Sequence, residues 1–311
     1  MLAILFKTLP FFALIGLGWW AGRTRFFSPE ATAYLTKFVF YFALSAMLFR
    51  FAANLTLAEI WDGRFALAYL WGCGVVYAVA MGVAFWRGTS VEEAAVEAQC
   101  AVIGNTGFLG VPMLVVLLGP QAAGPVILVL AIDLIVFSSV ITLVMTARRE
   151  GRMRLSVLGV LAAGLAKNPM IASMVLGLAW SATALPVPAP VNDFLGLLGA
   201  AATPGALFAI GASLATKSAE RLEVAAWLSF CKLILHPAAV AFAAFVLFKV
   251  DPAKAGVMVA AAALPVAGNV YILAQHYGVA PQRVSASILI STAVSILTVT
   301  AVIAWVTGGT A

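Results

Sequence analysis

The stretch CAVIGNTGFLGVPMLV, residues 100–115, interrupts a long apolar segment with residues that disfavour a continuous helix. It contains Asn105, Thr106, three glycines and Pro112. In hydrocarbon, an unpaired backbone group is costly, so an irregular segment is tolerated only inside protein or beside a wet cavity. The stretch therefore predicts a membrane helix that is broken near its middle and carries a function at the break.

The composition around this stretch is that of an integral membrane protein. Of the 311 residues, 64% are hydrophobic and only 10% are charged, with a mean hydropathy of +1.08. A soluble domain keeps about a quarter of its residues charged. The net charge of +6 does not indicate nucleic-acid binding, because the basic residues lie in short loops between apolar segments. The ten predicted spans, each long enough to cross the hydrocarbon core, are 2–21, 31–52, 65–86, 92–118, 122–147, 168–184, 191–215, 222–248, 254–277 and 283–306.

Charges in the loops predict the orientation. With the N-terminus outside, the inner loops contain eleven Lys and Arg residues and the outer ones five. The positive-inside rule then places both termini outside a plasma (inner) membrane in a multi-pass protein. The linker RREGRMRLSV, residues 148–157, is strongly charged and is expected to be cytoplasmic, continuing as an interfacial helix to residue 167. The N-terminus is interpreted as a retained first helix, not a signal peptide.

The two halves of the chain resemble each other. GNTGFLG at 104–110 matches GNVYILA at 268–274, and GPQAAG at 119–124 matches APQRVS at 280–285. AMLFRFAANL at 46–55 likewise matches GALFAIGASL at 205–214. Five spans per half force the second copy to enter the membrane upside down. The sequence thus predicts an all-α fold of two inverted five-helix repeats, 1–147 and 168–311, as in many secondary transporters.

The predicted breaks in spans 4 and 9 define a candidate binding site. Glycine frees the backbone and proline cannot donate to the preceding turn, so the helix-break residues are Gly104, Gly110, Pro112 and Pro265. A half-helix that begins at a break presents free N–H groups and a positive dipole end, which suit a carboxylate. The candidate substrate-binding residues are Asn105, Thr106, Gly107, Gly268, Asn269 and Val270. The alternative is that the breaks are packing kinks.

Polar residues within the spans are the next candidates, because intramembrane charges are usually functional. Asp133 lies in the middle of span 5, and Lys232 and His236 lie one turn apart in span 8. Asp133 could bind a coupling ion, pair structurally with Lys232, or line a wet cavity. Glu97 and Gln99 are expected to be helix-packing polar groups. Cys73, Cys100 and Cys231 lack paired spacing, so buried thiols are expected and no metal site is predicted.

The chain resembles the auxin efflux carrier family along its whole length. The resemblance rests on GNTGFLGVP, NPMIASMVLGL at 168–178, TPGALFAIGASLA at 203–215, KLILHP at 232–237 and ALPVAGNVYILAQHYG at 263–278. That family includes plant PIN-type auxin exporters and bacterial carriers of malonate-like acids, and is distantly similar to bile acid:sodium symporters. The resemblance implies that spans 4 and 9 cross at their breaks and that Asn105 and Asn269 contact substrate. It further implies a scaffold of spans 1, 2, 6 and 7, a homodimer through that scaffold, and a mobile transport unit of spans 3–5 and 8–10. Ser45 stands where the family often has a proline, and the long hydrophilic loop of many plant members is missing.

The expected function is transport of a small organic anion across a lipid bilayer by elevator-type alternating access. Export could be uncoupled or linked to protons, and sodium-coupled uptake is the alternative. No cofactor is therefore expected other than H⁺ or Na⁺ as a coupling ion. The sequence lacks HExxH, GxSxG and P-loop motifs, which argues against an enzyme or an ATP-driven pump. A channel would need a continuous polar pore, and the spans are too uniformly apolar for one.

Overall fold

The computed structural model describes residues 2–56, 62–150, 156–215 and 221–308, and nearly all of them are helical. The α-helices are α1 (Leu2–Arg23), α2 (Pro29–Phe38), α3 (Leu44–Ala53), α5 (Gly63–Trp86), α6 (Val91–Val102), α7 (Val111–Leu118), α8 (Ala123–Ile132), α9 (Ser138–Glu150), α10 (Ser156–Ala166), α11 (Pro169–Ser181), α12 (Ala189–Ala200), α13 (Ala202–Leu214), α14 (Leu222–Phe230), α15 (His236–Ala241), α16 (Pro252–Ala262), α17 (Gly268–Tyr277) and α18 (Pro281–Val306). Short π-helical or 3₁₀ segments join some of them: η1 (Val39–Ala43), η2 (Thr106–Gly110), η3 (Pro120–Ala122), η4 (Asp133–Phe137), η5 (Cys231–Leu235) and η6 (Phe242–Leu247).

Local sequence signals start the helices close to where the sequence predicts them. Ser28, Asp62 and Ser90 accept hydrogen bonds from the N–H groups of the first turns of α2, α5 and α6, at 3.1–3.2 Å. Asn168 and Asp251 cap α11 and α16 in the same way, each followed by a proline. These caps satisfy donors that a helix start leaves unpaired, and a proline there has no N–H to lose.

Six helical segments of the described chain are long and apolar enough to cross a membrane. They are Pro29–Ala53, Gly63–Trp86, Pro120–Arg148, Ala189–Leu214, Leu222–Leu247 and Pro281–Val306. Three further apolar helices are shorter: Thr106–Leu118, Pro169–Ser181 and Pro252–Ala262. Two of these short helices belong to predicted spans 4 and 9, and they are short because the breaks divide those spans. The protein is thus a multi-pass membrane protein.

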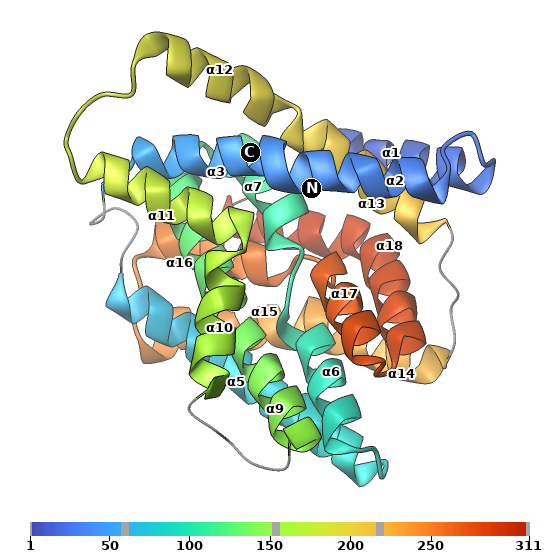
Figure 1. The fold of residues 1–311 in the computed structure, drawn as a ribbon. Coiled ribbons are helices and arrows are strands. Elements are labelled where there is room, and N and C mark those ends of the chain that lie inside the picture. The colour runs from blue at the N-terminus through green and yellow to red at the C-terminus, as the bar shows by residue number, and fades with distance from the viewer. Residues whose placement is uncertain (1, 57–61, 151–155, 216–220, 309–311) are drawn as a thin grey trace.

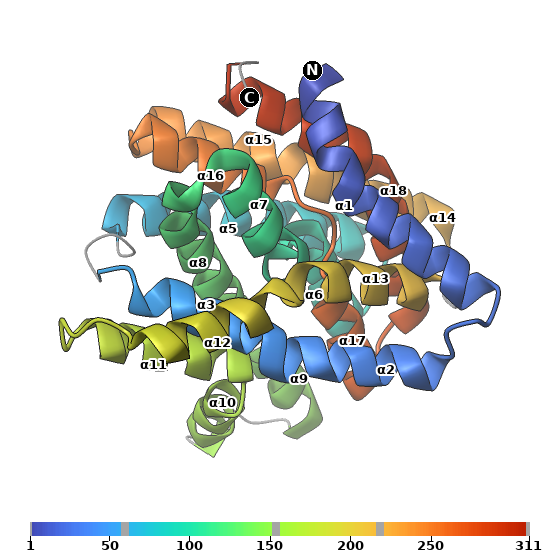
Figure 2. The same ribbon diagram turned by 90° about the horizontal axis from the view of Figure 1, so that it is seen from above.

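The helices pack in two groups. In the first, α1 packs against α13, α3 against α11 and α12, and α2 against α13. In the second, α5 packs against α6 and α15, and α14 against α18. Figure 1 shows the first group above the second. Figure 2 shows the molecule from above, with α1, α2, α12 and α13 of the first group in front. The helices α7 and α8 lie between the groups, because α7 contacts α1 and α13, and α8 contacts α3 and α16.

Small residues allow the closest helix contacts within the first group. A Cβ on Gly22 of α1 would lie 2.7 Å from the carbonyl oxygen of Ala212 in α13, and one on Gly177 of α11 would lie 2.7 Å from that of Phe49 in α3. Such close backbone approach is how membrane helices gain packing contacts without a hydrophobic driving force. The polar part of the predicted linker, residues 151–155, lies outside the described residues. The helix α10 follows it.

Candidate functional site

Both predicted breaks are present, and their backbones are hydrogen-bonded to each other. The helix α6 ends at Val102 and η2 begins at Thr106, while α16 ends at Ala262 and α17 begins at Gly268. Between these ends, Gly104 and Val266 form an antiparallel bridge. The Asn105 N–H donates to the Pro265 carbonyl at 2.8 Å, and the Ala267 N–H donates to the Ile103 carbonyl at 3.0 Å. Each break therefore supplies the hydrogen bonds that the other lacks, as hydrocarbon requires.

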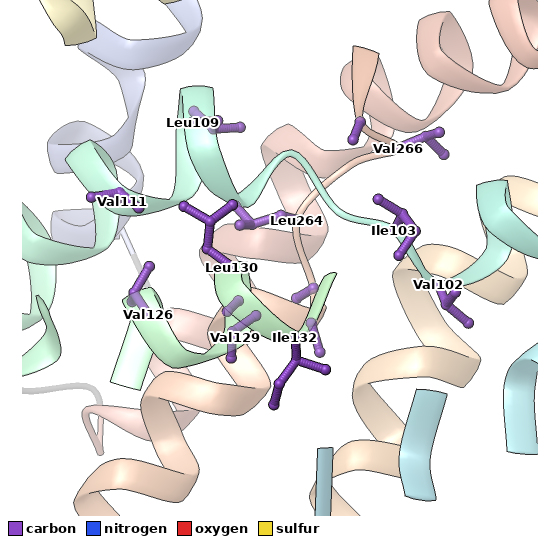
Figure 3. Close-up of a cluster of buried hydrophobic side chains, with 14 of the residues drawn as sticks. Val102, Ile103, Leu109, Val111, Val126, Val129, Leu130, Ile132, Leu264 and Val266 are labelled. Carbon is purple, nitrogen blue, oxygen red and sulfur yellow. The ribbon is translucent and has the colours of Figure 1, made fainter. Parts of the chain in front are cut away.

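An apolar layer encloses the paired breaks. Figure 3 shows the two extended segments passing close to each other, with Leu109, Leu130 and Leu264 gathered on one side of the crossing and Ile103 and Val266 flanking it. Val102, Leu109 and Leu264 are completely buried. This packing excludes lipid from the irregular backbone.

Of the glycines near the first break, Gly104 lies in the non-helical segment as predicted, whereas Gly107 and Gly110 lie inside η2. Gly104, Gly107 and Gly110 do not adopt positive φ angles, so left-handed backbone is not what they supply. They permit close contact instead: a Cβ on Gly107 would meet Met170 of α11 at 2.5 Å, and one on Gly110 would meet Leu264 at 2.5 Å. The assignment of Gly110 and Pro112 as helix-break residues is wrong. Gly110 lies inside η2, and Pro112 lies in the first turn of α7, where a proline fits without loss.

The break in span 9 follows the prediction more closely. Pro265 lies in its non-helical segment, and Gly268 and Asn269 begin α17. No side chain of the described residues caps either α17 or η2. The Thr106 N–H of η2 donates to the Gly104 carbonyl at 2.7 Å, whereas the N–H groups of Gly268 and Asn269 at the start of α17 make no hydrogen bond within the described residues and are available to a ligand.

The two asparagines lie at these helix starts. Asn105 is 7% exposed, and its carboxamide makes no hydrogen bond within the described part of the chain. The Oδ1 atom of Asn269 is buried and has no hydrogen-bond partner among the described residues. Buried polar atoms are nearly always paired, so an orphan needs an explanation. Thr106 and Val270 are buried beside the asparagines, and Gly268 is exposed.

Asp133 is held by hydroxyl groups. It is 3% exposed and begins the π-helical turn η4, a distortion that is common at functional sites. The hydroxyl of Tyr69 in α5 donates to Oδ1 at 2.9 Å, and that of Thr106 donates to Oδ2 at 3.2 Å. The carboxylate is therefore hydrogen-bonded to Thr106, the residue that follows the first break. Lys232 interacts with this carboxylate electrostatically, without an ion pair between the two among the described residues.

Lys232 and His236 lie against the second break. Lys232 is completely buried in η5, and its ammonium donates to the carbonyl of Ala262, the last residue of α16. The same ammonium lies 3.0 Å from Nδ1 of His236, whose Nε2 lies 3.1 Å from the Cys73 thiol. The carbonyl oxygen of Ala262 also lies 3.2 Å from Nδ1, so the ammonium, the imidazole and this carbonyl form one cluster. Positive charge thus meets the negative dipole end of the half-helix α16.

Sequence reasoning missed two partners of this cluster. Tyr69 lies in a predicted span, and the need of a buried Tyr hydroxyl for a partner is the signal that points to it. Cys73 was expected to be an inert buried thiol. It is buried, as are Cys100 and Cys231, but it also contacts His236.

A second charged cluster lies at the other end of α6. Glu97 is 1% exposed and pairs with Arg87 and with Arg283, the latter at 2.9 Å. Arg283 of α18 also reaches Glu93 at 3.2 Å. Glu97 is therefore more than the helix-packing group that the sequence suggests, because it ties α6 to α18 through buried charges.

Two cavities lie toward the two ends of the broken span 4. The first, of about 490 Å³, is bordered by Ser90, Glu92, Glu93 and Arg148 together with the turn after α17. The second, of about 190 Å³, lies between α3, α12 and α7 and is bordered by Arg50 and Pro112. Neither includes Asn105 or Asn269 in its lining.

Comparison with known proteins agrees with this arrangement. Residues 3–303 match a protein family described as "Membrane transport protein". The chain is 32% identical over 304 residues to the "Putative malonate transporter" of Rhizobium meliloti (strain 1021), covering 97% of this chain and 95% of that protein. It is 26% identical over 294 residues to the "Uncharacterized transporter YfdV" of Escherichia coli (strain K12) and of Shigella flexneri, covering 91% of each chain. The chain therefore belongs to the membrane transport protein family, whose members its auxin efflux carrier-like motifs resemble.

Proposed function

We propose that this protein is a secondary transporter of a small organic anion, such as the dicarboxylate malonate, which it binds where its two broken spans meet. The observation that carries the proposal is the pair of hydrogen-bonded breaks, with uncapped helix starts and the unpartnered Oδ1 of Asn269 beside them. Uncapped N–H groups bind carboxylates well. An asparagine amide adds a donor without the desolvation cost of a buried cation. Binding by dipoles alone also favours release, which a carrier needs.

The packing supports an elevator mechanism. The helices of predicted spans 1, 2, 6 and 7 contact one another, and so do most of those of spans 3–5 and 8–10. The first set is proposed as a fixed scaffold that dimerises, and the second as a unit that carries the breaks across the membrane. The equivalent positions of the breaks, with Asn105 and Asn269 at corresponding places, support two inverted repeats of five spans.

The proton is proposed as the coupling ion, with Asp133 as its site. Asp133 accepts hydrogen bonds from Tyr69 and from Thr106, and Thr106 starts the half-helix at the first break. A proton on Oδ2 turns that acceptor oxygen into a donor, so the Thr106 hydroxyl must then accept a hydrogen bond from it instead of donating one. Proton binding is thereby linked to the geometry of the anion site. The buried Glu97 is less suited, because Arg87 and Arg283 neutralise it.

The position of Lys232 argues against sodium coupling. Transporters with broken helices bind coupling cations at half-helix C-termini and unwound carbonyls. Here the ammonium of Lys232 donates to the terminal carbonyl of α16. A Cβ on Gly104 would lie 3.3 Å from Nζ, so the space between the breaks at this point is filled by that side chain.

Uptake of radiolabelled malonate by proteoliposomes tests the proposal. We expect saturable uptake that is stimulated by malonate on the opposite side, increases with an inward proton gradient and is unchanged when choline replaces sodium. A screen of monocarboxylates, dicarboxylates and bile acids under the same conditions defines the substrate class. Uptake that does not saturate would indicate a channel, and strict sodium dependence would favour the symporter alternative.

A further inference from the structure

The cavity between α3, α12 and α7 contains a cation that the described residues leave without an opposite charge. Arg50, near the C-terminal end of α3, borders this cavity, and no carboxylate does. Asp193 lies on the neighbouring helix α12, but Arg50 forms no ion pair with it or with any other described residue. An arginine near the end of a membrane helix can bring its charge to the interface, and one that borders a cavity without a carboxylate can bind an anion there.

The guanidinium is held in a defined orientation. Its Nε donates to Oδ1 of Asn192 in α12 at 3.0 Å, so a neutral amide, not an acid, fixes the side chain. The remaining N–H groups, on the two Nη atoms, are the planar pair that binds a carboxylate with two hydrogen bonds. Fixing Nε therefore orients the donors without neutralising them.

Two glycines of α12 make room for this arrangement. A Cβ on Gly196 would lie 3.3 Å from Nη1 of Arg50, and one on Gly199 would lie 3.2 Å from the backbone of Met47 in α3. Larger residues at either position would crowd the guanidinium or separate the two helices. The cavity of about 190 Å³ has the volume of about six water molecules in the liquid, which suits a small anion. Thr203 adds a hydroxyl to an otherwise apolar lining.

The cavity is bordered by the half-helix that follows the first break. Its third wall is α7, the half-helix that follows η2, and Pro112 is the wall residue nearest to the break in sequence. Pro112 follows Asn105 by seven positions, which corresponds to about 10 Å along a helix. The cavity is bordered both by α3 and α12 of the proposed scaffold and by α7 of the proposed mobile unit.

We infer that Arg50, held by Asn192, forms a second carboxylate-binding site, distinct from the one at the breaks, where the anion binds before or after its passage. The inference rests on the proposed function and adds to it a substrate-binding residue on the scaffold. It commits to a carboxylate, because the planar Nη pair and the small, mostly apolar cavity match a short organic acid.

The test measures malonate uptake by proteoliposomes containing Arg50→Gln, Arg50→Lys or Gly196→Val, with the exposed arginine variant Arg64→Gln as the matched control. Loss of a charge-assisted pair predicts a KM raised about tenfold or more for Arg50→Gln, with the maximal rate kept within about twofold. Arg50→Lys, which keeps the charge but not the planar fork, should lie between. Gly196→Val should raise KM without removing any charge, and Arg64→Gln should behave as wild type.

The outcomes separate this inference from the proposed function. Wild-type uptake with an unchanged KM in both Arg50→Gln and Gly196→Val overturns the second site and leaves the site at the breaks intact. A fall in maximal rate and melting temperature without a change in KM shows that Arg50 is only structural, and likewise overturns it. A wild-type protein that neither binds nor transports any carboxylate overturns the proposed function and this inference together.

Discussion

The buried charges Asp133 and Lys232 should compensate each other although no hydrogen bond joins them. Lys232→Met removes the charged donor to the buried Ala262 carbonyl and leaves only the His236 ring nitrogen at 3.2 Å beside it, which costs about 1–3 kcal/mol. It also leaves the Asp133 carboxylate buried without an opposite charge, so the total loss should be about 3–5 kcal/mol. Adding Asp133→Asn removes the uncompensated charge, so that only the cost of the lost hydrogen bond to the Ala262 carbonyl remains. The double variant should thus be about 2 kcal/mol more stable than Lys232→Met alone.

Unfolding of the purified protein in detergent, followed by heat or denaturant for wild type, both single variants and the double variant, measures this coupling. The pair Asp62–Lys254, at 3.2 Å but partly exposed, serves as the control cycle, and its coupling should stay within about 1 kcal/mol. Asp62→Asn keeps a capping side chain for α5, so the control does not confound charge with capping. If the double variant of the buried pair is as unstable as the sum of its single variants, the two charges act independently and the reasoning fails.

Three further changes test the neighbouring parts of the account. Asp133→Asn should abolish the increase of malonate uptake at lower external pH while the protein stays folded, and a persisting pH dependence would place the proton elsewhere. Gly104→Ala should destabilise the protein by about 1–3 kcal/mol, because its Cβ would lie 3.3 Å from the buried ammonium nitrogen of Lys232. Gly268→Ala has open space at its Cβ and should not destabilise the protein. Equal melting temperatures of the two variants would contradict this reasoning. Glu97→Gln should lower the melting temperature clearly, since it leaves the buried Arg283 guanidinium short of negative charge. Glu92→Gln, which breaks a more exposed pair, should change it little.

Much of the fold could be predicted from sequence because lipid imposes strong rules. Long apolar segments, short loops with capping residues and the glycine- and proline-containing interruptions each have one structural meaning in a membrane. The described helices accordingly begin and end within a few residues of the predicted spans, and both breaks lie where GNTG and PVAGN predict them.

The site was only partly predictable, since its details depend on which helices meet. Asn105, Thr106 and Asn269 could be identified by their place at a break. Sequence could not show that Asp133 bonds to Tyr69 and not to Lys232, because that choice depends on how α5 and η4 pack. The error at Gly110 and Pro112 has a local reason: the backbone is already helical at Thr106, so these residues serve packing and a helix start.

Malonate binding to the purified protein tests the central claim most directly. Isothermal titration of wild type, Asn105→Ala and Asn269→Ala should be compared with Gln282→Ala, which alters an exposed amide side chain in the first turn of α18. The account predicts that both variants at the breaks bind about tenfold more weakly or worse, with unchanged melting temperatures, while Gln282→Ala binds as wild type. Equal affinity in all four proteins would place the anion away from the paired breaks and contradict the account.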